Sequence, residues 1–138
     1  MGKSKVLTFV WLLCGVLLSG CAGRSAPACR EYKIFCGMSS KHGEVSEEAW
    51  RSFCDRHVSA AFPDGYTVID ATGYWRSASG AAARERAKVI SIVAPADAWG
   101  KVRSVAGRCR EEFGQESVLI SVAEAGAEIV DANAAPGE

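Results

Sequence analysis

The chain lacks most of the features that identify an enzyme or a nucleic-acid-binding protein. It has two histidines among 138 residues, and its 16 basic side chains are balanced by 16 acidic ones. It contains no Cys-x-x-Cys pair, no glycine-rich phosphate loop, no cluster of metal ligands and no internal repeat. The neutral charge balance argues against a nucleic-acid partner, and the missing motifs give no basis for a metal or another cofactor. We therefore expect none of the three.

Long hydrophobic runs are also missing. The longest apolar stretch, residues 6–18, has 13 residues, whereas a helix that crosses a bilayer needs about 20. Lys3 and Lys5 precede this stretch, and the small residues Ser19 and Gly20 follow it. A charged start, a short apolar segment and small residues before a cleavage point are typical of a secretory signal peptide. We therefore expect residues 1–20 to be removed on export.

The end of this segment, Leu18-Ser19-Gly20-Cys21, resembles the lipobox of bacterial lipoproteins. In that family the cysteine is acylated on its sulfur and, after cleavage, on its new amino group. The resemblance implies lipidation of Cys21, with residues 21–29 as a lipidated tether. Ala22 in place of aspartate implies the periplasmic face of the outer membrane in a Gram-negative host. The alternative is an ordinary secreted protein with a free Cys21.

Residue patterns after the tether predict the element order βαββαβ. Apolar alternation and β-branched residues predict strands over residues 30–38, 66–76, 84–94 and 117–123, with 39–44 as a loop. Ser46 is a typical N-cap for a first helix that ends at Phe62-Pro63-Asp64-Gly65. Asp97 is the predicted N-cap of a second helix, and Gly114 its C′ residue.

This element order favours one fold class, α+β. The simplest solution is a ferredoxin-like domain, a four-stranded antiparallel sheet in the order 4-1-3-2 with both helices on one face. We place this domain at residues 30–123 and expect residues 124–138, which are rich in alanine, glycine and acidic residues, to form a flexible tail. The second face of the sheet would be bare in a monomer, so a homodimer or another envelope protein is a candidate partner there.

Several strings of residues in this region share one pattern. They are Val45-Ser46 with Trp50, Phe62-Pro63-Asp64-Gly65-Tyr66-Thr67-Val68, Gly73-Tyr74-Trp75, Glu85-Arg86-Ala87-Lys88-Val89 and Phe113-Gly114-Gln115-Glu116-Ser117-Val118. Together, over residues 32–122, they resemble a family of small bacterial secreted domains and lipoproteins catalogued as domain of unknown function 3574. Cys36 and Cys54 depart from that pattern. The resemblance implies a compact α+β domain and brings no activity, substrate or catalytic residue with it.

The cysteines pose a disulfide question. Cys14 leaves with the signal peptide and Cys21 is acylated, so four cysteines face an oxidising compartment. These four are Cys29, Cys36, Cys54 and Cys109. Because Cys54 and Cys109 fall near the middle of two antiparallel helices, on their inward faces, we predict a disulfide between them. The alternative pairing is Cys36–Cys109.

One end of the predicted sheet gathers polar side chains around the hairpin between the second and third strands. These candidate ligand-binding residues are Trp75, Arg76, Glu85, Gln115 and Glu116. Arg76 can bind a carboxylate in a bidentate manner, and Glu85 can act as a base if burial raises its pKa. The structural alternative is a cross-strand ion pair between Arg76 and Glu85, with Gln115-Glu116 in a turn.

Taken together, the sequence favours a non-catalytic binding module that its N-terminal lipid tethers to the membrane of the cell envelope. The alternative is a small periplasmic enzyme in which Glu85 and Arg76 carry out proton transfer at the hairpin. An enclosed pocket with a perturbed carboxylate would favour the enzyme. An exposed apolar face or groove would favour the binding module.

Overall fold

The computed structural model describes residues 28–40, 43–76 and 79–130. The predicted signal peptide, the lipidation site Cys21 and most of the tether lie outside the described residues, as does the end of the predicted tail. The strands are β1 (Cys29–Gly37), β2 (Ser39–Ser40), β3 (Gly43–Glu44), β4 (Thr67–Arg76), β5 (Ala82–Pro95) and β6 (Leu119–Ala125). The helices are α1 (Glu47–Phe53), which continues through a π-helical turn (Cys54–Val58) into α2 (Ser59–Ala61), and α3 (Trp99–Glu112), which a 3-10 turn (Ala96–Ala98) precedes.

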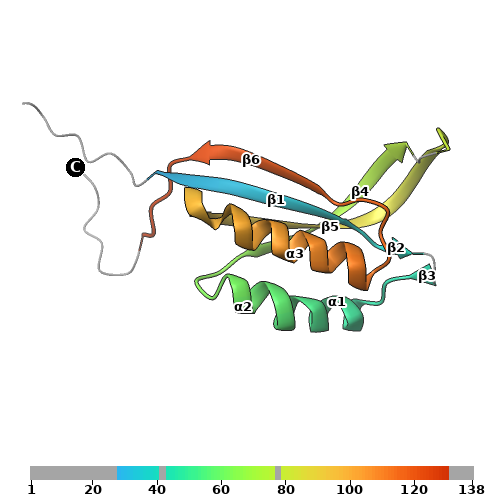
Figure 1. Cartoon of the computed structure of the whole chain (residues 1–138), viewed down its shortest axis with the longest axis horizontal. Helices are drawn as coiled ribbons and strands as arrows, with labels where there is room; N and C mark the ends of the chain where they lie inside the picture. Colours follow the sequence, from blue (N-terminus) through green and yellow to red (C-terminus); the bar gives the residue numbers. More distant parts are fainter. Residues whose placement is uncertain (1–27, 41–42, 77–78, 131–138) are drawn as a thin grey trace, which may run out of the picture.

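Four strands form one antiparallel sheet in the order β4-β5-β1-β6. This is the predicted order, and it confirms the α+β, ferredoxin-like architecture. Both helices lie on the same side of the sheet, and the β4–β5 hairpin projects past their ends (Figure 1). β1 pairs with β5 along its whole length and with β6 along most of it. The central position of β1 explains why its alternate residues are so completely buried.

The core lies between the sheet and the helices. Tyr32, Ile34 and Cys36 alternate along β1 and are fully buried, as period-two alternation predicts. From the first helix, Trp50 stacks on Phe53 with ring centroids 5.6 Å apart. Other fully buried side chains of the core are Met38, Val58, Ile90, Val102 and Cys109.

The helix ends show which capping signals in the sequence were informative. The Ser46 hydroxyl accepts a hydrogen bond from the Ala49 amide at 3.1 Å, as expected of an N-cap. Gly114 has φ +60°, and the Gln115 amide donates to the Arg110 carbonyl at 2.9 Å, which makes a Schellman motif. The prediction for Asp97 is wrong. It lies inside the 3-10 turn, and the N-cap position belongs to Ala98, which has no capping side chain.

Several predicted boundaries need correction, because β1 sets the length of its neighbours. Cys29, placed in the tether, is the first residue of β1 and pairs with Pro95 on one side and Ala125 on the other. These pairings extend β5 beyond its predicted end and carry β6 two residues into the predicted tail. The predicted loop at residues 39–44 contains the small β2–β3 ladder, in which Ser39 pairs with Glu44.

Within residues 28–40, 43–76 and 79–130, no helix or strand covers the sheet face opposite the helices. Its register places Ile69, Val93 and Leu119 on this side, where they are 46%, 51% and 54% exposed. In the part of the chain that the structure describes, no helix has the length and apolar character to span a bilayer.

Candidate ligand-binding groove

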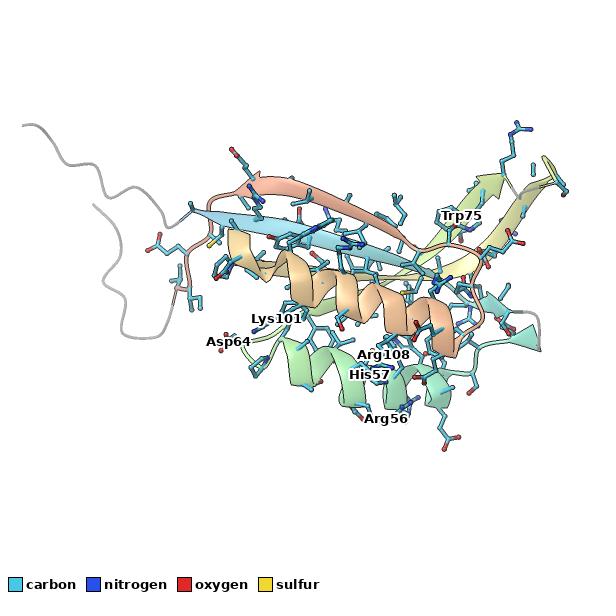
Figure 2. All side chains as sticks on the ribbon, in the orientation of Figure 1. Arg56, His57, Asp64, Trp75, Lys101 and Arg108 are labelled. Carbon is cyan, nitrogen blue, oxygen red and sulfur yellow. The ribbon has the colours of Figure 1, made fainter. Side chains whose placement is uncertain are left out.

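A groove of about 620 Å³ opens on the uncovered side of the sheet, beside the β4–β5 hairpin. All five predicted residues line it, from β4, from β5 and from the segment between α3 and β6. They are Trp75, Arg76, Glu85, Gln115 and Glu116. Trp75 lies on the projecting hairpin, and Asp64 lies far from it, at the other end of the helix layer (Figure 2). Phe35, Gly37, Ser39, Tyr74, Ser117 and Leu119 complete most of the wall.

Strand register brings Trp75 and Glu85 to the same wall. Gly73 pairs with Glu85 in the β4–β5 ladder, and Trp75 is two residues farther along β4, on the same face. The indole lies across Gly73, so a Cβ there would be 2.7 Å from Trp75 Nε1. Glycine is thus required for the close approach of the ring. The Trp75 Nε1–H group is buried and has no hydrogen-bond partner among the described residues, and such an unsatisfied donor costs about 1–3 kcal/mol.

A second glycine forms the floor of the groove. A Cβ at Gly37 would meet Gln115 Oε1 at 2.6 Å, Glu85 Oε1 at 2.7 Å and Glu85 Oε2 at 2.9 Å. Gln115 is held in place because its Nε2 donates to the Ser39 carbonyl at 2.6 Å. The carboxylate and the amide oxygen therefore converge over Gly37, and both side chains are half-buried.

Arg76 does not pair with Glu85. Its guanidinium donates to the Gly80 carbonyl at 3.0 Å, across the hairpin turn. Arg76 pairs with Ala82 at the last position of the β4–β5 ladder, where strand alternation turns it away from Glu85, so it borders the groove only from the hairpin end. No ion pair joins Arg76 to Glu85 within the described ranges. The cross-strand pair is thus not formed, and the turn alternative for Gln115 is right in that its amide closes the Schellman motif.

A separate charged groove of about 460 Å³ lies on the helix side of the sheet. The Lys88 ammonium is buried there and pairs with Asp70 and with Glu47, the latter at 3.0 Å. Hydrogen bonds from Lys88 hold the pKa values of Asp70 and Glu47 below their ordinary range, and Asp70 in turn raises the pKa of Lys88. Arg86 bridges Glu44 and Glu47 at 2.6 and 2.7 Å. Because these charges satisfy one another, we interpret this network as structural.

Cys36, Cys54 and Cys109 come together in the core, where all three are free thiols. Both predicted disulfide pairings stay predictions. The thiol that hydrogen-bonds with Cys109 belongs to Cys36 rather than to Cys54. This hydrogen bond and burial raise the pKa of Cys36, and burial raises that of Cys54 to about 11. Thiols held in their neutral form are poor nucleophiles and metal ligands. Among the described residues, no group of three or more histidine, cysteine or acidic residues is arranged to hold a metal ion.

The family model for "Protein of unknown function (DUF3574)" matches residues 31–128. The chain belongs to the DUF3574 family. No curated protein matches this DUF3574 chain. Among solved structures, a phage SAM lyase in complex with S-methyl-5′-thioadenosine is similar at 20% identity and a TM-score of 0.61, over 76% of this chain and 88% of the lyase. CutA from Synechococcus elongatus is similar at 12% identity and a TM-score of 0.51, over 77% and 88%. These likenesses show a shared fold.

Sequence reasoning about this DUF3574 chain missed three features, two in the groove and one in the separate charged network. Gly37 gave a local signal, because a glycine that ends an alternating strand often marks a close approach. The unpaired Trp75 Nε1–H group gave no signal in the sequence, because its burial depends on how the indole lies over Gly73. The Lys88 network was missed because the register that pairs Lys88 with Asp70 is set by tertiary packing.

Proposed function

We propose that this protein is a lipid-tethered, non-catalytic binding module of the bacterial cell envelope, and that the groove beside the β4–β5 hairpin is its binding site. Lipidation at Cys21 would hold it at the membrane, on the periplasmic face of the outer membrane in a Gram-negative host. The ligand class that fits is a small polar molecule or a peptide end with an apolar part. A second copy or another envelope protein remains a candidate partner for the uncovered sheet face.

The observation that carries the proposal is the state of the acceptor groups on the groove wall. Glu85 has no hydrogen-bond or ion-pair partner among the described residues that line the groove, and its carboxylate and Gln115 Oε1 converge over Gly37. Polar groups that are shielded from water are paired in the great majority of proteins. A half-buried carboxylate without a partner on a concave wall is therefore best explained by a ligand that completes it.

The groove is open on one side and is walled by Phe35, Tyr74, Trp75 and Leu119. Aromatic and aliphatic walls with a few convergent polar groups are typical of ligand sites. An open groove supports binding more than catalysis, because an enzyme gains most from a site that excludes water.

A thermal-shift screen of the full chain in detergent tests the proposal. The probes are a set of dipeptides and nucleosides that includes S-methyl-5′-thioadenosine, the ligand of the similar lyase structure. We expect at least one probe to raise the melting temperature of the wild type and to leave that of Trp75→Leu unchanged. Trp99→Leu, which changes a tryptophan on α3 away from the groove, should retain the shift. Equal shifts in all three proteins, or no shift with any probe, would contradict the proposal.

The second candidate is a small enzyme that uses Glu85 as a general base. The half-buried, unpartnered carboxylate of Glu85 favours it, since a base must reach a substrate proton without a competing partner. Arg76 is a weaker candidate for a catalytic role, because its guanidinium donates to the Gly80 carbonyl. Turnover of a bound probe that Glu85→Gln abolishes, with binding retained, would establish this candidate over the binding module.

A further inference from the structure

Two acceptor groups converge in the groove, the Glu85 carboxylate and the Gln115 amide oxygen, and no hydrogen bond to either is found among the described residues. Gln115 Nε2 donates to the Ser39 carbonyl at 2.6 Å. A backbone carbonyl can only accept, so this contact fixes which end of the amide is the nitrogen. Gln115 Oε1 is thereby directed to the point over Gly37 where the two carboxylate oxygens of Glu85 also converge.

Three oxygens thus lie 2.6, 2.7 and 2.9 Å from one point, the ideal Cβ position of Gly37. That point is one bond length from the Gly37 Cα, so a ligand atom cannot occupy it and must reach the converging oxygens from the groove side. An ionised carboxylate and an amide oxygen are both acceptors. The group that satisfies both at once is a donor with several hydrogens, and a positive charge on it makes each hydrogen bond stronger. An ammonium or a guanidinium meets this description.

The charge of the residues that line the groove also favours a cationic ligand. The charged residues on the wall are Glu85, Glu116 and Arg76, so carboxylates outnumber the guanidinium. The Arg76 guanidinium is directed to the Gly80 carbonyl at the hairpin turn. Trp75 lies next to Glu85 in the ladder, and an indole face attracts a cation. The remaining wall, with Phe35, Tyr74 and Leu119, suits an apolar body.

We propose that the ligand of this groove is an organic cation, whose ammonium or guanidinium binds between Glu85 and Gln115 while its apolar part packs on Trp75. This inference rests on the proposed function, because it names the ligand class of the same groove. It also assigns Glu85 a role in recognition: the carboxylate is the counter-ion of the ligand. Gln115 serves as the second acceptor, which the Ser39 carbonyl orients.

Three probes of similar size and different charge provide the test. They are 2-phenylethylammonium, the neutral 3-phenylpropan-1-ol and the anionic 3-phenylpropanoate. Binding to the full chain in detergent is followed by the indole NMR signal of Trp75, which is assigned from Trp75→Phe. We expect the cation to bind at least tenfold more tightly than the alcohol, and the anion to bind more weakly than either, because charge-assisted hydrogen bonds are the strong ones.

Two variants locate the effect. Glu85→Gln keeps the shape and removes the charge, and it should weaken the cation by tenfold or more while leaving the alcohol unchanged. Glu124→Gln, on β6 outside the groove, should change neither. If Glu85→Gln is unstable, Glu116→Gln replaces it as the test. This variant also removes one negative charge from the groove wall, and we expect it to reduce the preference for the cation over the alcohol by a smaller factor.

The outcomes separate the two proposals. Tight binding of the alcohol or the anion, or a Glu85→Gln variant that binds the cation as well as the wild type does, would overturn the cation inference and leave a binding groove. Failure of all three probes to move the Trp75 signal, together with no shift in the thermal screen, would overturn the proposed function itself.

Discussion

Gly37 is the residue on which the geometry of the groove depends most directly. Its missing side chain makes room for the Glu85 carboxylate and the Gln115 amide oxygen, which a Cβ would meet at 2.6 to 2.9 Å. We expect Gly37→Ala to lower the free energy of unfolding by about 1 kcal/mol, since overpacking of this kind costs about 1–3 kcal/mol and the displaced groups are flexible side-chain ends. Urea unfolding measures the loss, and the Trp75 indole signal reports the altered groove.

The matched control for Gly37→Ala is Gly107→Ala, in the middle of α3, where a Cβ meets nothing within 4 Å. This change should raise stability by about 0.5–1 kcal/mol, because alanine favours a helix interior over glycine. If Gly37→Ala were as stable as the wild type with an unmoved Trp75 signal, the close approach of Glu85 and Gln115 would be wrong.

Lys88 predicts a dependence of stability on pH. It holds the pKa values of Asp70 and Glu47 below their ordinary 3.8 and 4.5. Between the lowered folded values and the ordinary values, the unfolded chain binds more protons than the folded chain. This contribution to stability is therefore complete above about pH 5 and is lost as the pH falls through the folded pKa values. We expect the melting temperature of Lys88→Met to fall less steeply than that of the wild type between pH 5 and pH 3. Lys101→Met, on the surface of α3, should follow the wild-type profile, and parallel profiles for all three would contradict the role of Lys88.

At the residue scale, the sequence predicted which residues line the groove better than it predicted the contacts that these residues make. The five groove residues were found because the topology places their segments at one end of the sheet. The sequence did not predict that Arg76 donates to the Gly80 carbonyl, or that Gln115 Oε1 points toward Glu85. Each contact depends on a side-chain rotamer and a neighbour that no local sequence pattern encodes.

Among the elements, the end of α3 connects helix stability to the groove. Gly114 adopts φ +60°, and the next residue closes the Schellman motif and also places its side chain in the groove. Gly114→Ala should cost about 1–2 kcal/mol, because left-handed backbone is unfavourable for residues with a Cβ. Gly114→Asn should cost less, since asparagine tolerates this conformation. Chemical denaturation compares the two variants, and an alanine variant more stable than the asparagine variant would contradict the assignment.

The elements themselves were predictable where the signal is local. The alternation of β1, the Ser46 cap and the glycine after α3 all depend on period and capping chemistry. The π-helical turn Cys54–Val58 was not predictable, because the apolar spacing there fits an ordinary helix. Strand ends were shifted by pairing with β1, which acts over long sequence distances.

For the whole molecule, the cysteines decide whether the core is cross-linked. Cys36 hydrogen-bonds with Cys109, so the structure favours the alternative pairing over Cys54–Cys109. In protein exported to an oxidising compartment, we expect non-reducing peptide mapping to find Cys36 joined to Cys109. By the chain-entropy model this bridge would stabilise the fold by about 4 kcal/mol. Cys54→Ala should keep the Cys36–Cys109 bridge, and Cys36→Ala should lose it. A disulfide-linked Cys54–Cys109 peptide would contradict this pairing and support the pairing between the two helices.

The fold and the proposed anchor together limit how far the domain can lie from a membrane. Seven residues separate Cys21 from β1, and at up to about 3.5 Å each they reach roughly 25 Å. With Cys21 lipidated as proposed, the start of β1 would stay within that distance of the membrane surface, and the groove would lie at the other end of β1, beside Gly37. The near-neutral chain has no basic run to hold anionic lipid, so membrane retention would then depend on the acyl chains.

This dependence gives the last prediction. Cys21→Ser removes the acylated sulfur, so we expect the protein to move from the membrane pellet to the soluble fraction after cell fractionation. Multiple acyl chains contribute about 0.8 kcal/mol per buried methylene, and no other described segment replaces them. Cys14→Ser, inside the apolar segment of the leader, should leave the protein with the membrane. Because Cys21 precedes the domain, the soluble variant should bind the cationic probe as tightly as the wild type does. Retention of Cys21→Ser in the pellet would contradict the lipid anchor while leaving the groove intact.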